Sequence, residues 1–291
     1  MAVTDVGIAA GGLDYVIGDA IMQFNKANVC FNLCTTKPAP DGSLYVRFPV
    51  YSNVDSSKVT NNATGAEDAD LSATSMTTTA VDVEVLRNGI RIDITDLARW
   101  GSGDDLYGNA GDIIGNALAA EFDNHITALF ASLSTNTVGD GSAALSLGNW
   151  FDSIQKLRAS NAPEPYAFVG HPGQIWGSKG LSAVLNVSGS NAIGTLGQPG
   201  EQMAQNGYVG TLAGVDVFYS NEIALSGTGT DEAKGAMFSK STFGVGYKDP
   251  MISIEEQRDA SAGLSELIGN GYWNSAELVD GFGCLVHTQA A

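Results

Sequence analysis

The clearest hydrophobic pattern in the chain is helical and covers residues 107–133. Apolar residues recur there at steps of three and four, which places them on one face of a helix. They are Ile114, Leu118, Phe122, Ile126, Leu129, Phe130 and Leu133. Asp104 and Asp105 stand just ahead, where carboxylates suit the positive end of a helix dipole. A helix of roughly 40 Å is too long to complete a small core alone, so we expect a strut across a sheet or a neighbouring helix.

Glycines and polar residues modify this helix. Gly108, Gly111 and Gly115 weaken its first turns, because glycine is a poor helix former. The firm part is therefore expected to begin near Asp112. The polar residues fall mostly away from the apolar face: Asp112, Asn116, Asp123 and Asn124.

A second amphipathic helix is predicted over residues 150–159. The residues expected on its inward face are Trp150, Phe151, Ile154 and Leu157. Asn149 precedes the helix and is the expected N-cap, because its side chain can accept a hydrogen bond from a free backbone N–H.

Alternation of apolar and polar residues predicts strands over 43–50, 76–85 and 86–96. The stretch between the first two, residues 53–75, is rich in Ser, Thr, Asn, Ala and acidic residues and buries almost nothing. Two strands with such a tip form an extended hairpin that stands away from the body. An isolated two-stranded ribbon is only marginally stable in water, so we expect this hairpin to pack on another subunit.

The two ends of the chain differ in pattern. Residues 1–37 are weakly patterned, with a short helix expected at 13–24, and they are interpreted as an arm. Beyond residue 163, short strands alternate with Gly-rich turns. The strands expected there are 166–169, 236–238, 243–247, 252–256, 264–268, 272–278 and 282–287, and residues 211–220 are expected to form a turn followed by a strand. The predicted fold class is α+β.

Composition and charge narrow the classes of protein to which this chain could belong. Fourteen basic residues against 32 acidic ones give a net charge of −18, whereas nucleic-acid binding needs clustered Lys and Arg. The hydrophobic content of 44% is that of a globular protein. No window reaches eighteen apolar residues, and the N-terminus lacks the basic region of a signal peptide. We therefore expect no membrane association.

Motifs for chemistry are weak. Residues 173–179 miss the P-loop spacing by one residue, and no Ser has the glycine spacing of a nucleophile elbow. Cys30, Cys34 and Cys284 are interpreted as buried or free thiols in a reducing compartment. No catalytic constellation emerges, so the chain is predicted to be no enzyme and to carry no cofactor.

Two places could hold a metal ion. Glu121 and His125 are four residues apart on the long helix, although a polar flank of a packed helix explains them better. The acidic residues of the hairpin tip, Glu67, Asp68 and Asp70, could bind a divalent cation, but a solvated acidic loop is the simpler interpretation. Neither is predicted as a metal site.

In this order of elements the chain resembles the major capsid proteins of tailed bacteriophages, which share the HK97-like fold. Its most specific stretches are late in the chain: YAFVGHP at 166–172, GYVGTLAGVDVFYSN at 207–221, and residues 236–248 followed by 252–259. The resemblance covers nearly the whole chain. It implies an N-terminal arm over 1–38, an extended hairpin (the E-loop) over 39–88, and a P-domain whose first part, 89–165, includes a spine helix at 105–133. It further implies an A-domain over 166–235, P-domain return strands over 236–278, and a C-terminal strand over 279–291 that returns to the A-domain.

The resemblance also implies a function and partners. The subunit would assemble as hexamers and pentamers into an icosahedral shell around phage double-stranded DNA, located in the virion and assembled in the host cytoplasm. The implied partners are further copies of the chain, a separate scaffolding protein, a portal protein, a decoration or cement protein, and packaged DNA held by weak nonspecific contact.

Inter-subunit contacts are expected from charged residues of the hairpin and the following strand. They are Arg47, Lys58, Glu67, Asp68, Asp70, Arg87 and Arg91. Some members of the family cross-link an E-loop Lys to a neighbour's Asn. Lys58 is the only Lys of this hairpin, and no partner Asn can be assigned, so that chemistry is not carried over.

Other classes of protein remain open. An encapsulin-like compartment shares the fold and encloses cargo enzymes, and a cargo partner would separate it from a phage shell. An acidic surface-layer protein or adhesin would explain the Thr- and Gly-rich texture, but it would carry a secretion signal. An enzyme would need a catalytic cluster, and none was found.

Overall fold

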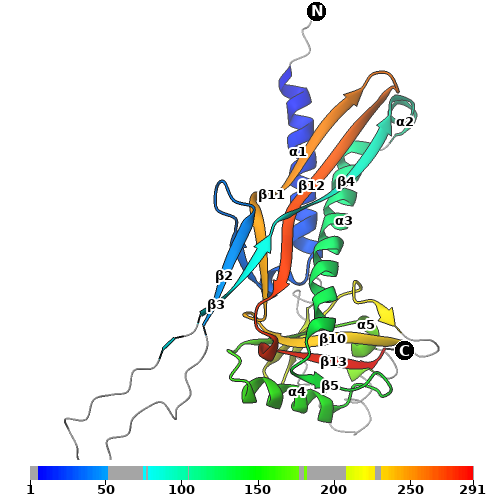
Figure 1. The fold of residues 1–291 in the computed structure, drawn as a ribbon. Coiled ribbons are helices and arrows are strands. Elements are labelled where there is room, and N and C mark those ends of the chain that lie inside the picture. Colours follow the sequence, from blue (N-terminus) through cyan, green and yellow to red (C-terminus); the bar gives the residue numbers. More distant parts are fainter. Residues whose placement is uncertain are drawn as a thin grey trace, which may run out of the picture.

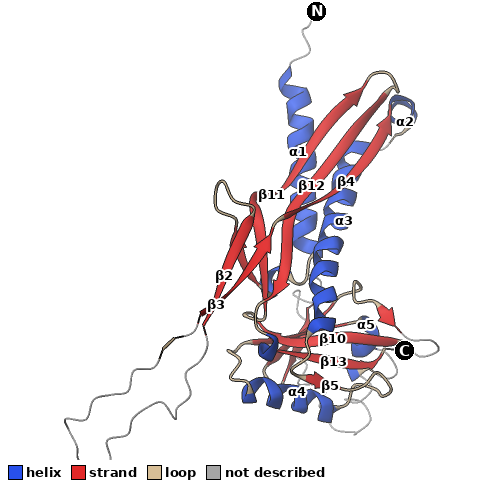
Figure 2. Ribbon diagram, viewed as in Figure 1, coloured by secondary structure: helices blue, strands red, loops and turns tan. Residues whose placement is uncertain are grey.

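The computed structural model describes residues 6–51, 75–76, 78–103, 105–176, 180–181, 208–226 and 231–290. Figure 1 shows an elongated upper body of two long helices and long strands, standing on a lower sheet whose strands run across it. Helices and strands occur throughout, which confirms the α+β class (Figure 2). None of the described helices combines the length and hydropathy needed to cross a membrane.

The upper sheet has four strands, two of them unusually long. In order across the sheet they are β1 (Thr35–Pro38), β11 (Phe243–Asp259), β12 (Leu264–Glu277) and β4 (Leu86–Thr95). β1 runs parallel to β11, and the other pairs are antiparallel. The sequence predicted each long strand as two short ones. In β11 the division is a bulge, because residues 248–251 stand opposite Tyr272 alone.

The predicted strut is α3 (Leu106–Ala128), extended by the 3-10 turn η3 (Leu129–Ser132). Of the apolar residues predicted on one face, all are buried except the half-buried Leu129. α3 packs against β12 and β4, and Phe122 contacts Trp273 of β12 with ring centroids 5.7 Å apart. The strut across a sheet is confirmed, and it begins at Leu106 instead of Asp112.

The N-terminal helix α1 (Val6–Ala27) is longer than the predicted 13–24 and belongs to the core. Its residues Val16, Ala20 and Phe24 are buried against α3. Gly111 and Gly115 of α3 face α1 so closely that a Cβ on Gly111 would lie 3.0 Å from the Val16 carbonyl oxygen. The glycines thus permit close contact between the two helices.

The lower sheet has seven strands. In order they are β5 (Thr137–Val138), β13 (Gly283–Gln289), β10 (Glu232–Ser239), β6 (Tyr166–Gly170), β8 (Val215–Tyr219) and β7 (Tyr208–Leu212), with β9 (Leu225–Ser226) also paired to β10. Helices α4 (Leu147–Ala159) and α5 (Pro172–Trp176) pack against strands of this sheet (Figure 1). The implied division between residues 235 and 236 falls inside β10.

Helix α4 corrects two details of the predicted 150–159 helix. It begins at Leu147, and its N-cap is Ser146, whose Oγ accepts a hydrogen bond from the Asn149 backbone N–H at 3.1 Å. Asn149 therefore lies inside the first turn and is not the cap. Phe151, predicted inward, is 54% exposed, because the buried face of the helix is set by Trp150, Ile154 and Leu157.

The predicted hairpin is confirmed in the described part of its two strands. β2 (Tyr45–Tyr51) pairs antiparallel with β3 (Thr78–Glu84) as a separate two-stranded sheet. Most of the polar tip, 53–75, lies outside the described residues. Three short helical segments were not predicted: η1 (Phe31–Leu33), α2 (Asp96–Gly101) and η6 (Asp280–Phe282).

Candidate assembly surface

The hairpin has one face toward the body and one toward solvent. Val46, Phe48 and Val83 are buried on the inner face, where they form a small core with residues of β12 that include Tyr272. A Cβ on Gly246 of β11 would lie 2.9 Å from Val46, so the glycine allows this close packing. The described base of the hairpin is therefore fixed to the upper sheet.

The outer face of the hairpin carries a cation between two tyrosines. Arg47 donates from Nε and Nη2 to both carboxylate oxygens of Asp82, at 2.7 and 2.9 Å. This ion pair lowers the pKa of Asp82 and raises that of Arg47. Tyr45 and Tyr51 are exposed on the same strand face, at alternate positions. The face is polar and aromatic, a composition typical of contact surfaces.

The other predicted contact residues are not gathered with Arg47. Arg87 and Arg91 lie on β4; Arg87 donates to Asn270 Oδ1 at 2.8 Å, and Arg91 pairs with Asp93 and Glu266 at 2.8 and 3.2 Å. Four more residues lie outside the described part of the chain: Lys58, Glu67, Asp68 and Asp70. Their role in contacts between subunits stays a prediction.

A surface that the sequence did not reveal lies on α2, at the far end of the upper body (Figure 1). Leu97 and Trp100 are each 80% exposed there. Asp96 binds Arg258 through both oxygens at 2.9 and 2.5 Å, and Thr95 caps the helix. This polar anchorage holds a short helix whose large apolar side chains point away from the core. The signal in the sequence was the pair Leu97 and Trp100, two large apolar residues beside the charged Asp96 and Arg99.

A buried carboxylate ties the end of α1 to the strut. Asp123 of α3, only 3% exposed, accepts hydrogen bonds from the backbone N–H groups of Val29 and Cys30 at 2.8 and 2.9 Å. Burial raises the pKa of Asp123 to about 6, although these two hydrogen bonds act in the opposite direction. The sequence pattern placed Asp123 away from the apolar face, whereas the chain folds over it.

The two residues considered as metal ligands lie side by side on the helix. His125 Nε2 lies 3.2 Å from Glu121 Oε1 along α3. Within the described ranges, no group of three or more His, Cys, Asp or Glu side chains could hold a metal ion. Cys30, Cys34 and Cys284 are buried free thiols, as expected.

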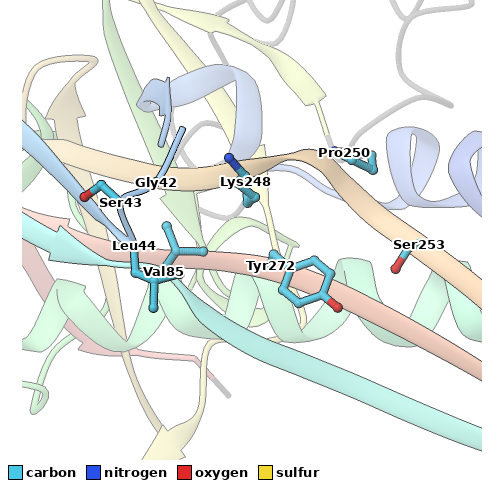
Figure 3. Close-up of a pocket in the computed structure, with 8 residues that line it drawn as sticks. All are labelled: Gly42, Ser43, Leu44, Val85, Lys248, Pro250, Ser253 and Tyr272. Carbon is cyan, nitrogen blue, oxygen red and sulfur yellow. The ribbon is translucent and has the colours of Figure 1, made fainter. Parts of the chain in front are cut away.

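A pocket of about 490 Å³ opens where the hairpin joins the body (Figure 3). Its lining comes from the segment that leads into β2, from the residue just before β4, and from strands β11 and β12. The lining residues are Gly42, Ser43, Leu44, Val85, Lys248, Pro250, Ser253 and Tyr272. The pocket therefore lies where the base of the hairpin meets the upper sheet.

Comparison with known proteins gives matches in structure alone. No family model and no curated protein sequence matches the chain. Its structure is similar to the capsid of the cyanophage P-SCSP1u, with a TM-score of 0.64, 16% identity, and coverage of 92% of this chain and 90% of that one. The capsid of Ralstonia phage GP4 gives a TM-score of 0.64, 11% identity, and coverage of 91% and 92%.

A third similar structure is a virus-like particle from Pyrococcus furiosus, with a TM-score of 0.59, 9% identity, and coverage of 94% and 98%. At sequence identities this low, the structural matches establish a shared fold and nothing more. The chain therefore has the HK97-like capsid fold over nearly its whole length, as the resemblance implied.

Proposed function

We propose that the chain is the major capsid protein of a tailed bacteriophage, which self-assembles into the shell of the virion. The observation that carries this proposal is the shared fold over about nine-tenths of the chain with capsid structures. The exposed hairpin and the exposed apolar end of the upper body agree with it. Both would leave contact surface uncovered in a monomer, and both could be covered by neighbouring subunits in a shell.

The proposal assigns parts of the structure to parts of a capsid subunit. The upper sheet with α3 is the P-domain and its spine, the β2–β3 ribbon is the E-loop, and the lower sheet is the A-domain. We place β10 wholly in the A-domain, so that the division falls after Ser239, since β10 pairs with β6 and β13 along its length. The proposal also includes assembly as hexamers and pentamers in the host cytoplasm. It further includes three partners: a scaffolding protein, a portal protein and a decoration protein.

Electron microscopy of the purified chain tests the proposal directly. We expect shells, or rings of five and six copies, with and without a scaffolding partner. Because the chain carries a net charge of −18, raising the ionic strength from about 0.05 to about 0.5 M should promote assembly by screening repulsion. A compact monomer at every salt concentration would contradict a shell-forming function.

The α2 end provides a test by mutation. We expect Trp100→Ser to raise the protein concentration needed for assembly by about tenfold, because a large exposed apolar anchor is lost from a contact. The fold should be unchanged, since the side chain is 80% exposed. Light scattering measures assembly and circular dichroism measures folding.

Phe151→Ser is the matched control for Trp100→Ser. Phe151 is another exposed aromatic residue, on α4 of the lower body. Equal loss of assembly in both variants, or normal assembly of Trp100→Ser, would rule out α2 as a specific contact.

A protein compartment that encloses cargo is the second candidate, because the match to a virus-like particle, over 98% of that chain, shows that this fold also occurs in a particle that is not named as a phage capsid. This candidate is not better supported than the phage shell. The contents of particles purified from the native source distinguish the two: packaged double-stranded DNA indicates a phage capsid, and an enclosed enzyme indicates a compartment.

A further inference from the structure

The pocket at the hairpin base has the size and lining of a ligand site. Pockets that bind small molecules commonly measure roughly 300–1,000 Å³ and combine apolar walls with a few polar groups. Here the volume is about 490 Å³, and Leu44, Val85, Pro250 and the Tyr272 ring supply apolar surface. Figure 3 shows Leu44 beside Val85, with the Tyr272 ring extending toward Ser253.

The polar groups of this pocket retain free hydrogen-bonding capacity. Lys248 donates one hydrogen bond, at 2.9 Å, to Asp41, whose side chain is fully exposed. An ammonium group has three donors, so two remain. Neither the Tyr272 hydroxyl nor the Ser253 hydroxyl bonds to any other residue that the structure describes. One cation and two hydroxyls therefore line an apolar hollow with few partners of their own.

We propose that this pocket binds a small amphipathic anion, with an aromatic or aliphatic body and one carboxylate or sulfonate group. The apolar walls would take the body, and Lys248 would pair with the anionic group, because a charge-assisted hydrogen bond is stronger than a neutral one. The anionic group would share the Lys248 ammonium with the exposed carboxylate of Asp41 or displace it.

The position of the pocket gives such a ligand a structural consequence. Ser43 and Leu44 lead into β2, whereas Lys248 and Pro250 belong to the β11 bulge. A ligand between them fills the joint between the hairpin and the upper sheet. Because it binds the folded joint and not the unfolded chain, it stabilises this arrangement in proportion to its occupancy. This inference concerns binding by the subunit and does not depend on the proposed capsid function.

Calorimetric titration of the purified full-length chain tests the proposal with two matched probes. They are 8-anilinonaphthalene-1-sulfonate, an aromatic anion, and N-phenyl-1-naphthylamine, which has the same aromatic body without the sulfonate. We expect one site per chain and roughly two- to fivefold tighter binding of the anion, the range for one partly exposed ion pair. Equal affinities for the two probes, or no binding, would overturn the proposal.

Substitutions locate the site. Lys248→Gln should remove the preference for the anionic probe, and Leu44→Gln should weaken both probes by about tenfold through loss of apolar surface. The controls are Lys240→Gln and Leu86→Gln, which change exposed residues outside the pocket lining. If the controls weaken binding as much as the pocket variants do, the probes bind elsewhere and the proposal fails. Lys248→Gln alone decides the outcome if Leu44→Gln does not fold.

Discussion

Gly115→Ala is expected to destabilise the protein by about 2 kcal/mol, although alanine is the better helix former. A Cβ at this position of α3 would press against the Ala20 carbonyl oxygen and would lie 2.9 Å from Gln23 Cβ and 3.0 Å from Ala20 Cα. Backbone atoms of α1 cannot move aside as a side-chain end can. The two helices would have to separate, and the packing of Val16 and Phe24 would loosen with them.

Gly18→Ala is the control for this prediction. Gly18 lies on the exposed side of α1, where a Cβ would meet nothing within 4 Å. Alanine should therefore stabilise the protein there by up to about 1 kcal/mol. Urea denaturation of both variants gives the comparison, and opposite signs are expected. A stabilised Gly115→Ala variant would contradict the close contact between α1 and α3.

The parts of the fold that the sequence predicted are those with local periodicity. The apolar positions of α3 repeat within a few residues, and the strands of the hairpin alternate in the same way, so each element could be found without knowing its partner. The order of these elements was sufficient for the resemblance to the capsid fold. Pairing over long distances, as between β1 and β11, leaves no such local mark.

The errors arose where tertiary contacts replaced the usual signals. α1 buries Val16, Ala20 and Phe24 against α3, but Gly11 and Gly12 are poor helix formers, so the helix was predicted only from residue 13. The bulge in β11 interrupts the alternation of one strand and gave the appearance of two. At α4, Ser146 and not Asn149 caps the helix, so the predicted start of the helix was wrong by three residues. None of these features can be read from a single segment alone.

The candidate contact surface was predictable only in part. Charged residues such as Arg47 were identified from the hairpin pattern, whereas Leu97 and Trp100 were not, because exposure of a large apolar residue depends on the fold around it. The same limit applies to Asp123. Its position in the helix indicates a polar flank, and only the path of the chain after α1 covers it.

The second large effect concerns this buried carboxylate and its dependence on pH. Asp123 is covered by the turn after α1, with Cys30 in contact and Glu222 contributing a further negative charge. Its pKa in the folded protein, about 6, is above the ordinary value of 3.8. The folded state therefore binds more protons than the unfolded state between these pH values, and the contribution of this group to stability increases as the pH falls.

The neutral variant Asp123→Asn isolates this titration from all others. On lowering the pH from 7 to 4.5, the stability of the wild-type chain relative to Asp123→Asn should rise by about 2 kcal/mol, at about 1.4 kcal/mol per pKa unit. Urea denaturation of the unassembled chain at each pH measures the difference. A difference that stays constant as the pH is lowered, or that becomes smaller, would show that the carboxylate is not buried as described.

Asp259→Asn serves as the control, because the stability of the wild-type chain relative to this variant should stay nearly constant between pH 7 and 4.5. Asp259 accepts hydrogen bonds at 2.6 Å from the Ser261 hydroxyl and at 2.9 Å from the Ser261 backbone N–H, and these lower its pKa. Its contribution is therefore present throughout this range and is lost only as the pH falls below the ordinary value of 3.8. At neutral pH both substitutions remove one carboxylate and change the net charge equally. A rise in relative stability for Asp123 alone then arises from the two environments: one buried under the α1 turn, the other exposed at the β11–β12 turn.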